Sequence, residues 1–154
     1  MPRREEGGAP PVAVSPQAFL RMGREVLAQQ PFSVLIGAEL AALSSGACEL
    51  HVPVTDHVKQ QHGFVHGGVV CYAADNALTY AGGTALRVPV VTSEFKINYV
   101  RPAIGERLIA RARAEHVGRT QAVCRCDVFV VDGGAEKLCA VAQGTITALP
   151  AKAP

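Results

Sequence analysis

Hydrophobic and polar positions along the chain predict an early helix that packs one face against the rest of the protein. Ser15 and Pro16 have the residue types of a helix N-cap and a first helical position. The helix is expected to extend to about Gln30, because Pro31 cannot continue it without losing a backbone hydrogen bond. Its buried stripe is expected to consist of Phe19, Met22, Val26 and Leu27.

Strand-like stretches account for most of the remaining chain, because apolar and polar residues alternate there or β-branched residues gather between turns. The expected strands cover approximately residues 38–43, 47–54, 91–99, 108–117, 121–131 and 137–149. Short glycine-containing turns, such as Ser44-Ser45-Gly46, join neighbouring strands and favour antiparallel hairpins. In the third strand, the period of two places Ser93 on the face opposite to Thr92.

The most apolar segment of the chain predicts a second helix that is buried on every side. It begins near Gly68, after a polar stretch at residues 55–66 that is expected to form a loop, and reaches about Ala81. Apolar residues occupy all faces of this helix, which marks it as a core helix rather than an amphipathic surface helix. The pair Gly82-Gly83 is expected to end it.

The predicted order of elements is one helix, two strands, one buried helix and four further strands. A strand run dominated by hairpins forms an antiparallel sheet, and one such sheet wrapped around one long apolar helix buries both economically. This is the α+β arrangement of the hot-dog fold, here with an extra N-terminal helix. We expect a disordered tail over residues 1–14 and a single hot-dog domain over residues 15–150.

Composition and charge narrow the classes of function. The 154 residues, 49% of them hydrophobic, suffice for one domain. A net charge of +2 without a basic block, together with 5% aromatic residues, argues against nucleic acid as a partner. The sequence shows neither the apolar run of a secretory signal nor an uninterrupted membrane span, and its five cysteines lie among apolar residues. We therefore expect a cytoplasmic protein with reduced thiols and no membrane contact.

Asp75 is a candidate catalytic residue, because it is the only charged residue between His66 and Arg87. A carboxylate in a buried helix costs several kcal/mol unless hydrogen-bond donors, water or a substrate meet it. Such a group is therefore a candidate for chemistry. A structural alternative is that Asp75 caps a loop or pairs with Arg87 or Arg101.

The start of the same helix is a candidate site for a carbonyl oxygen that acquires negative charge. The run His66-Gly67-Gly68 would place unpaired N–H groups at the helix N-terminus, where the helix dipole also favours negative charge. From Gly67 to Asp75 the helix rises about 12 Å, whereas an oxyanion donor and a base must each lie about 3 Å from one reacting group. One subunit cannot supply both, so we expect a dimer in which two antiparallel helices share two sites around a twofold axis.

Several motifs occur together and in a fixed order. They are Gln60, the run His62-Gly63-Phe64-Val65-His66-Gly67-Gly68, Asp75, the run Asn98-Tyr99-Val100-Arg101-Pro102-Ala103 and the pair Gly118-Arg119. In these motifs the chain resembles the PaaI-like acyl-CoA thioesterases of the hot-dog superfamily, over residues 32–149. The resemblance implies hydrolysis of an acyl-CoA thioester to a carboxylic acid and CoA, without a cofactor, by a homodimer or a dimer of dimers.

The resemblance also implies catalytic roles. The N–H of Gly67 polarises the thioester carbonyl, and Asp75 acts either as the nucleophile or as the general base that activates water. The side-chain amide of Gln60 positions the water or the substrate. His66 is expected to brace the loop by hydrogen bonding rather than to transfer protons.

Further contacts follow from the same resemblance. Ser93 and Thr79 each occupy the place of a supporting hydroxyl, in different members of the family, so both are candidates. Arg101, Arg119 and Gly68 are expected to contact CoA, the two arginines through its phosphates or ribose.

No metal site is expected, because the spacing of His57, His62 and His66 matches no zinc signature. Two alternative functions remain open at this point. A hot-dog hydratase or dehydratase would act on an acyl thioester with a catalytic histidine and an acid, and a non-catalytic module would only bind acyl-CoA. The preference for an aromatic or an aliphatic acyl chain depends on packing that the sequence does not describe.

Overall fold

The sheet is the largest element of the computed structural model, which describes residues 13–151. Its six antiparallel strands lie in the order β1-β2-β4-β5-β6-β3. They are β1 (Glu39–Ser44), β2 (Ala47–Pro53), β3 (Val90–Tyr99), β4 (Arg107–Val117), β5 (Gln121–Asp132) and β6 (Ala135–Ala148). The helices are α1 (Pro16–Ala28), α2 (Pro31–Leu35) and α3 (Gly67–Leu86), with the 3-10 turn η1 (Asp56–Val58) before α3. Of the predicted disordered tail, residues 1–12 lie outside the described residues.

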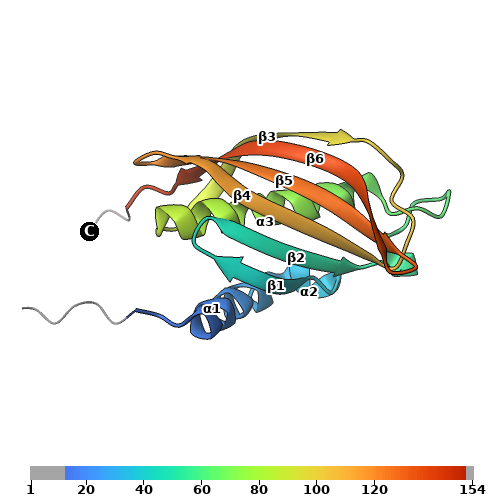
Figure 1. Cartoon of the computed structure of the whole chain (residues 1–154), viewed down its shortest axis with the longest axis horizontal. Helices are drawn as coiled ribbons and strands as arrows, with labels where there is room; N and C mark the ends of the chain where they lie inside the picture. Colours follow the sequence, from blue (N-terminus) through green and yellow to red (C-terminus); the bar gives the residue numbers. More distant parts are fainter. Residues whose placement is uncertain (1–12, 152–154) are drawn as a thin grey trace, which may run out of the picture.

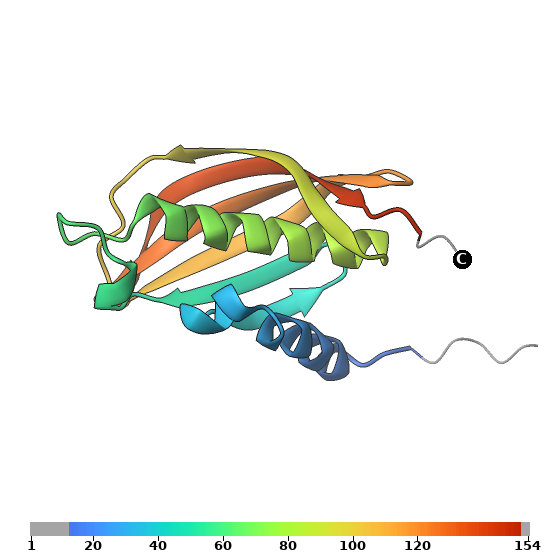
Figure 2. The same ribbon diagram turned by 180° about the vertical axis from the view of Figure 1, so that it is seen from behind.

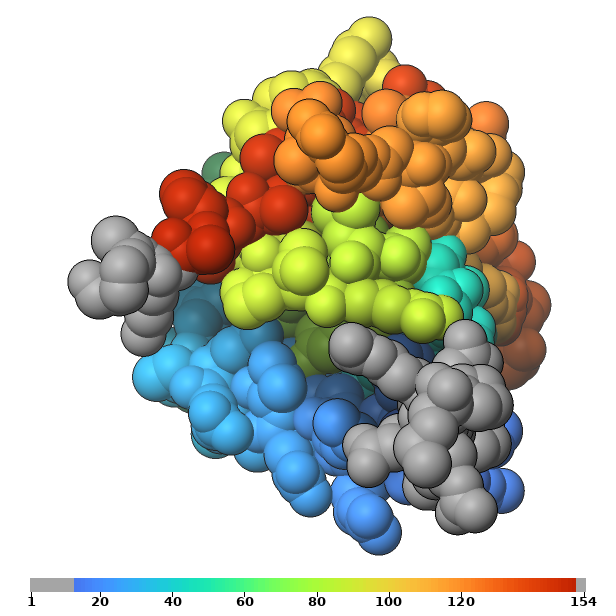
Figure 3. Space-filling view, turned by 90° about the vertical axis from the view of Figure 1, so that its left-hand side faces the viewer, coloured from blue at the N-terminus to red at the C-terminus, as the bar shows by residue number. Residues whose placement is uncertain are grey.

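The sheet curls around α3, which lies along its concave face (Figure 1, Figure 2). Small side chains with no exposed surface dominate the buried part of the helix, and they let strands approach its axis. The fully buried helix residues are Ala73, Ala74, Ala77, Leu78 and Ala81, and the sheet contributes Leu50, Leu108, Val128 and Ile146 to the same core. The predicted hot-dog fold, with its antiparallel sheet, long central helix and extra N-terminal helix, is confirmed. Figure 3 shows the end of the molecule at which the first turns of α1 and the last turns of α3 lie.

The core helix is longer than the sequence predicted, because the glycine pair lies inside it. Helix α3 ends only at Leu86, and Arg87 then adopts the left-handed conformation with φ 59°. Gly82 serves packing rather than termination, since a Cβ atom at this position would lie 2.5 Å from the Cβ atom of Ile146 on β6. A residue without a side chain therefore lets the helix and β6 approach closely.

We expect Gly82→Ala to lower the free energy of unfolding by about 1–3 kcal/mol, because the added methyl group overpacks the helix against β6. Gly83→Ala is the matched control, because its added Cβ atom would meet only the Cγ2 methyl group of Val90, at 3.0 Å rather than 2.5 Å. Alanine at that position also gains up to about 1 kcal/mol of helix propensity. Urea titrations of both variants measure the difference, and equal stability of the two would contradict the packing role of Gly82.

The N-terminal segment forms two helices where the sequence predicted one. Ser15 caps α1 as expected, and its hydroxyl accepts a hydrogen bond from the N–H of Ala18 at 3.2 Å. Pro31 does end the first helix, but it also opens α2, where its missing N–H is not needed. This short second helix was missed. It docks on α3 through Tyr72, whose hydroxyl donates to the Oγ atom of Ser33 at 2.6 Å.

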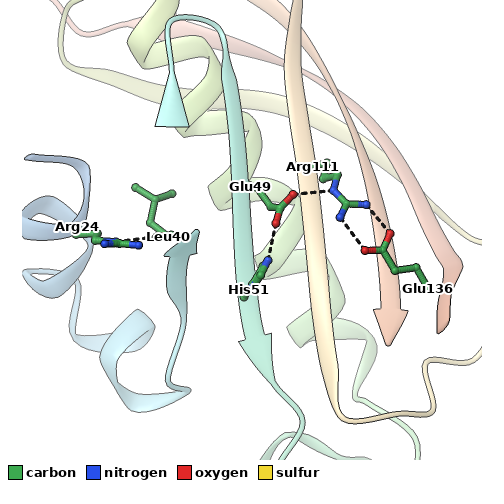
Figure 4. A network of polar contacts seen from close by, with 6 residues as sticks. All are labelled: Arg24, Leu40, Glu49, His51, Arg111 and Glu136. Carbon is green, nitrogen blue, oxygen red and sulfur yellow. Dashed lines mark hydrogen bonds and ion pairs between the residues drawn. The ribbon is translucent and has the colours of Figure 1, made fainter. Parts of the chain in front are cut away.

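The buried stripe predicted for α1 is wrong in part. Met22 and Val26 are each 53% exposed. Leu27 is buried as predicted, and Leu20 and Gly23 lie beside it on the packed face. Arg24 strengthens the contact, because its Nε atom donates to the backbone oxygen of Leu40 on β1 at 2.9 Å (Figure 4). Apolar residues lie on more than one side of this helix, and only the contact with β1 decides which of them are buried.

The outer face of the sheet, away from α3, carries a network of ion pairs (Figure 4). Arg111 pairs with Glu49 at 2.7 Å and with Glu136 at 2.6 Å, and the Nε2 atom of His51 lies 2.7 Å from Glu49. Burial tends to raise the pKa of Glu49, but hydrogen bonds from Arg111 and His51 outweigh burial and lower it. The network links β2, β4 and β6 on the face opposite to the core helix.

Candidate active site

The N-terminus of α3 offers a backbone donor. His66 is the N-cap of this helix, and its Nδ1 atom accepts the N–H of Gly68 at 2.9 Å. The N–H of Gly67 has no acceptor among residues 13–151. Because the first N–H groups of a helix lack intrahelical partners and this end of the dipole is positive, the Gly67 N–H suits an oxygen that acquires negative charge.

A pocket with a volume of about 400 Å³ opens beside this end of the helix. Three residues expected at the site, Gln60, Gly67 and Arg101, line it together. The other lining residues are Phe64, Val65, Val70, Tyr99, Val100, Pro102, Ala103 and Cys139. The structure thus joins an N–H donor, an amide and a guanidinium group in a largely apolar hollow, as ligand sites commonly do. Within residues 13–151, no carboxylate lines this pocket.

Two polar side chains of the pocket, Gln60 and Arg101, have N–H groups that can donate hydrogen bonds to a ligand. The Oε1 atom of Gln60 accepts the N–H of His62, so the Nε2 group remains to donate to a ligand. Arg101 is exposed, and within residues 13–151 the only hydrogen bond of its side chain is a long one of 3.4 Å, from Nη1 to the backbone oxygen of Leu138. Its guanidinium group can therefore turn toward a phosphate at the pocket mouth.

Asp75 lies half-buried on α3 and is held by hydroxyl groups. The Oγ1 atom of Thr92 on β3 donates to its Oδ1 atom at 2.6 Å. Thr79, one turn further along the helix, donates its hydroxyl to the backbone oxygen of Asp75 at 2.8 Å and also lies 2.9 Å from the hydroxyl of Thr92. No ion pair of Asp75 is present among the described residues, and neither Arg87 nor Arg101 contacts it. The alternative that Asp75 pairs with Arg87 or Arg101 is therefore wrong for the described residues.

The donor and the acid occupy different places in one chain. Gly67, Cys71, Asp75 and Thr79 follow one another at intervals of four residues, along the side of α3 that faces β3. The helix is continuous between Gly67 and Asp75, so its rise separates them by about 12 Å. Within one chain, the Gly67 N–H and the Asp75 carboxylate therefore do not reach the same reacting group.

A β-bulge changes which hydroxyl of β3 faces the acid. The pairing of β3 with β6 shifts register between Thr92 and Glu94, so the strict alternation predicted for this strand fails there. Thr92 consequently faces the helix, whereas the Oγ atom of Ser93 donates to the backbone oxygen of Thr145 at 3.1 Å. Thr92 was missed by sequence reasoning, because nothing in the local pattern indicates the bulge.

We expect Thr92→Val to lower kcat about tenfold, because the carboxylate loses a charge-assisted hydrogen bond worth about 1.5 kcal/mol. Valine has nearly the same shape as threonine, so the strand should remain intact. Thr92→Ser should retain most activity, and Ser93→Ala should have no effect on turnover. Steady-state kinetics of the three variants test this, and a larger loss in Ser93→Ala than in Thr92→Val would show that Ser93 supports the acid.

The other residues expected to contact CoA lie apart within the chain. Gly68 adjoins Gly67 at the pocket end of α3, although its N–H is taken by His66. Arg119 is exposed in the turn between β4 and β5, and the neighbouring Thr120 pairs with Ala148 near the far end of the helix (Figure 1). Arg101 and Arg119 therefore do not meet in one chain. Among residues 13–151, no three His, Cys, Asp or Glu side chains gather as metal ligands would.

Tyr99 is a pocket residue to which sequence reasoning gave no role. Its hydroxyl donates to the backbone oxygen of Gly67 at 3.0 Å, and its ring lies against the same residue. Burial raises the pKa of Tyr99 and that of neighbouring Cys71, and the charge of Asp75 raises the latter further. Cys71 therefore carries a protonated thiol at neutral pH and is no candidate nucleophile.

A hot-dog sheet around a helix that holds a carboxylate and starts with an N–H group without an acceptor in residues 13–151 is compatible with thioester hydrolysis, and comparisons with known proteins support this class of enzyme. The sequence profile of the thioesterase superfamily matches residues 62–137. A solved thioesterase family protein from Silicibacter pomeroyi is 34% identical, with 86% of this chain and 99% of that chain covered and a TM-score of 0.81. The chain belongs to the thioesterase superfamily.

Two further proteins similar to this chain have more specific names. A variant of the phenylacetic acid degradation protein PaaI from Thermus thermophilus is 32% identical, with 78% of this chain and 100% of that chain covered and a TM-score of 0.68. The 1,4-dihydroxy-2-naphthoyl-CoA hydrolase of Listeria monocytogenes is 26% identical over 113 residues, which cover 72% of this chain and 89% of that protein. The chain is thus a PaaI-like hot-dog thioesterase. None of the helices in residues 13–151 is long and apolar enough to span a membrane.

Proposed function

We propose that the protein hydrolyses acyl-CoA thioesters at a site to which two subunits contribute. One observation carries the proposal: the pocket at the start of α3 contains the Gly67 N–H, Gln60 and Arg101, but the nearest candidate acid lies two helical turns away. Asp75 has a second carboxylate oxygen, Oδ2, that meets no donor within the described residues. Within residues 13–151, the pocket lacks an acid and Asp75 has an unpaired carboxylate oxygen, so two copies of the chain can complement each other.

The edge strand β3 is a surface through which two copies of the chain can pair. Strand β3 is an edge strand of ten residues, and a second β3 would satisfy its unpaired backbone groups. Thr92 near one end of β3 touches Asp75, whereas Tyr99 at the other end touches Gly67. An antiparallel pair of β3 strands around a twofold axis would therefore bring Asp75 of the partner subunit toward Gly67. A dimer is the smallest assembly that meets this requirement, and a dimer of dimers retains it.

The proposed chemistry needs an ionised carboxylate and a fixed donor. The carboxylate of Asp75 either attacks the thioester carbon, forming an anhydride that water then cleaves, or takes a proton from the water that attacks. In both cases the carbonyl oxygen becomes negative, and the Gly67 N–H stabilises that charge. The C–S bond then breaks, the sulfur leaves as the CoA thiolate and is protonated, and the acyl group ends as a carboxylic acid. Gln60 donates through its Nε2 group to the water or the substrate.

Recognition of CoA is supported by charge at the pocket mouth and by a relative. Arg101 is exposed beside the pocket and suits a phosphate. Arg119 lies at the opposite end of α3, so it would reach the same CoA only from the partner subunit, whose helix runs the other way. The name of the Listeria monocytogenes relative, a naphthoyl-CoA hydrolase, also favours a CoA thioester.

We propose residues 15–150 as one catalytic domain and the cytoplasm as its place of action. All five cysteines are free, and four of them are buried. Burial raises the pKa of Cys48 and of Cys126, which keeps these thiols protonated and unreactive. Such side chains behave as small apolar core residues and suit a reducing compartment.

Thiol release from a panel of acyl-CoAs tests the proposed function. The panel should contain short aliphatic, long aliphatic and aromatic acyl groups, because the largely apolar lining of the pocket suits each of them. We expect CoA thiol to appear with at least one of them at a kcat of about 1 s⁻¹ or more, the usual range for enzymes. Changes in enoyl absorbance without thiol release would indicate a hydratase, and intact substrate after long incubation with the whole panel would indicate a binding module.

A further inference from the structure

The peptide group between Gly67 and Gly68 is held on both sides by side chains. The Tyr99 hydroxyl donates to its carbonyl oxygen at 3.0 Å, and the Nδ1 atom of His66 accepts its N–H at 2.9 Å. The two side chains come from different elements, since His66 precedes α3 and Tyr99 ends β3. One rigid peptide plane is thus tied both to the helix cap and to the sheet.

This peptide needs such support because both of its residues are glycines. Glycine loses more backbone freedom on ordering than any other residue, and the first turn of a helix lacks intrahelical partners for its N–H groups. Because the peptide is planar, fixing its C=O and its N–H fixes the whole group. The N–H of Gly67 lies in the preceding peptide plane, whose carbonyl oxygen, that of His66, accepts the N–H of Val69 at 2.9 Å. Fixed planes on both sides of the Gly67 Cα atom therefore orient this N–H.

The protonation of both side chains suits this task. Burial raises the pKa of Tyr99, so its phenol keeps the donated proton at neutral pH. His66 accepts through Nδ1, so that atom carries no proton of its own to transfer. Tyr99 also lies over Gly67 closely enough that an added Cβ atom would be 3.6 Å from its ring, in ordinary contact.

We propose that His66 and Tyr99 are positioning residues that together clamp the Gly67–Gly68 peptide and so aim the Gly67 N–H at the thioester oxygen. The inference rests on the proposed function, because it gives that N–H its role. Neither side chain needs to touch the reacting atoms. An oxyanion donor stabilises a transition state most when it is oriented beforehand, so the clamp acts on kcat rather than on substrate affinity.

Kinetics of single and double variants test the clamp. Tyr99→Phe and His66→Ala should each lower kcat about fivefold and change KM less than about twofold, since only orientation of the donor is lost. The double variant should lose about tenfold rather than the product of both losses, because both groups hold one peptide. His66→Asn should restore most of kcat, as asparagine is a good N-cap acceptor.

Tyr80→Phe is the matched control. Tyr80 lies on the same helix, and its hydroxyl donates to the backbone oxygen of Gly23 at 2.8 Å, far from the pocket. This variant loses a tyrosine-to-carbonyl bond of the same kind but should keep the wild-type kcat. Wild-type kcat in Tyr99→Phe, or a double variant whose loss equals the product of the single losses, would overturn the clamp.

Amide hydrogen exchange tests the clamp without a substrate. The N–H of Gly68 should exchange at least about fivefold faster in Tyr99→Phe and in His66→Ala than in the wild type, because both variants loosen the same peptide. Unchanged exchange in Tyr99→Phe would overturn the inference even if turnover fell. Absence of thioesterase activity in the wild type would instead overturn the proposed function, and the exchange rates would still decide whether the clamp exists.

Discussion

Asp75→Asn is expected to lower kcat at least about 100-fold and to leave the fold intact. Asparagine has nearly the same shape as aspartate, but it can act neither as an anionic nucleophile nor as a base. Its Oδ1 atom can still accept the hydroxyl of Thr92, so the contact that holds residue 75 to β3 is kept. Thiol release gives kcat, and thermal unfolding of the same preparation gives stability.

The stability measurement separates a catalytic from a structural role of Asp75. Because Asp75 has no ion pair within residues 13–151, the Asn variant should unfold at the wild-type temperature or slightly higher, since a half-buried carboxylate held by one hydroxyl group is still unfavourable. Asp127→Asn is a control for loss of a carboxylate elsewhere, because Asp127 lies on the outer face of the sheet near Arg125. Near-normal turnover in a clearly destabilised Asp75→Asn protein would refute the assignment.

Gly67→Pro is expected to lower kcat about 10²- to 10³-fold, the usual effect of losing one oxyanion donor. Proline removes the N–H of residue 67, and its ring suits the first position of a helix. The preceding residue tolerates it too, because His66 already has the extended backbone, φ −59° and ψ 133°, that proline requires of its neighbour. Gly67→Ala is the matched control, since it keeps the N–H and its methyl group meets Tyr99 at 3.6 Å. Equal activity of the two variants would show that this N–H has no catalytic role.

The two inactive proteins should complement each other when their subunits are exchanged. Each Asp75→Asn subunit keeps a good Gly67 donor, and each Gly67→Pro subunit keeps a good acid, so one heterodimer contains one complete site. Random reassociation of equal amounts should restore about a quarter of the wild-type activity, because half of the dimers regain one of two sites. Light scattering should show a dimer or a larger assembly. A fully active wild-type monomer, or no recovery in mixtures proven to exchange, would contradict the shared site.

Much of the fold follows from local patterns. Alternation along the strands and the short turns between them predicted the antiparallel sheet, and the uniformly apolar segment around Asp75 predicted the core helix. The end of that helix was predicted wrongly, because Gly82 is a packing residue against Ile146 and not a stop signal. The buried face of α1 was also wrong in part, since β1 selects that face and lies elsewhere in the sequence.

For the site, the sequence by itself determined the separation of donor and acid, because helix rise depends only on the number of residues between Gly67 and Asp75. The resemblance to a known family placed Gln60 and Arg101 near Gly67, and the pocket contains all three. Only the tertiary structure decided which hydroxyl meets the acid and what holds the oxyanion peptide. Thr92 faces Asp75 because a bulge shifts the register of β3 against β6, and Tyr99 reaches Gly67 across 32 residues of chain. Contacts of this kind depend on register and long-range packing, which local residue patterns do not encode.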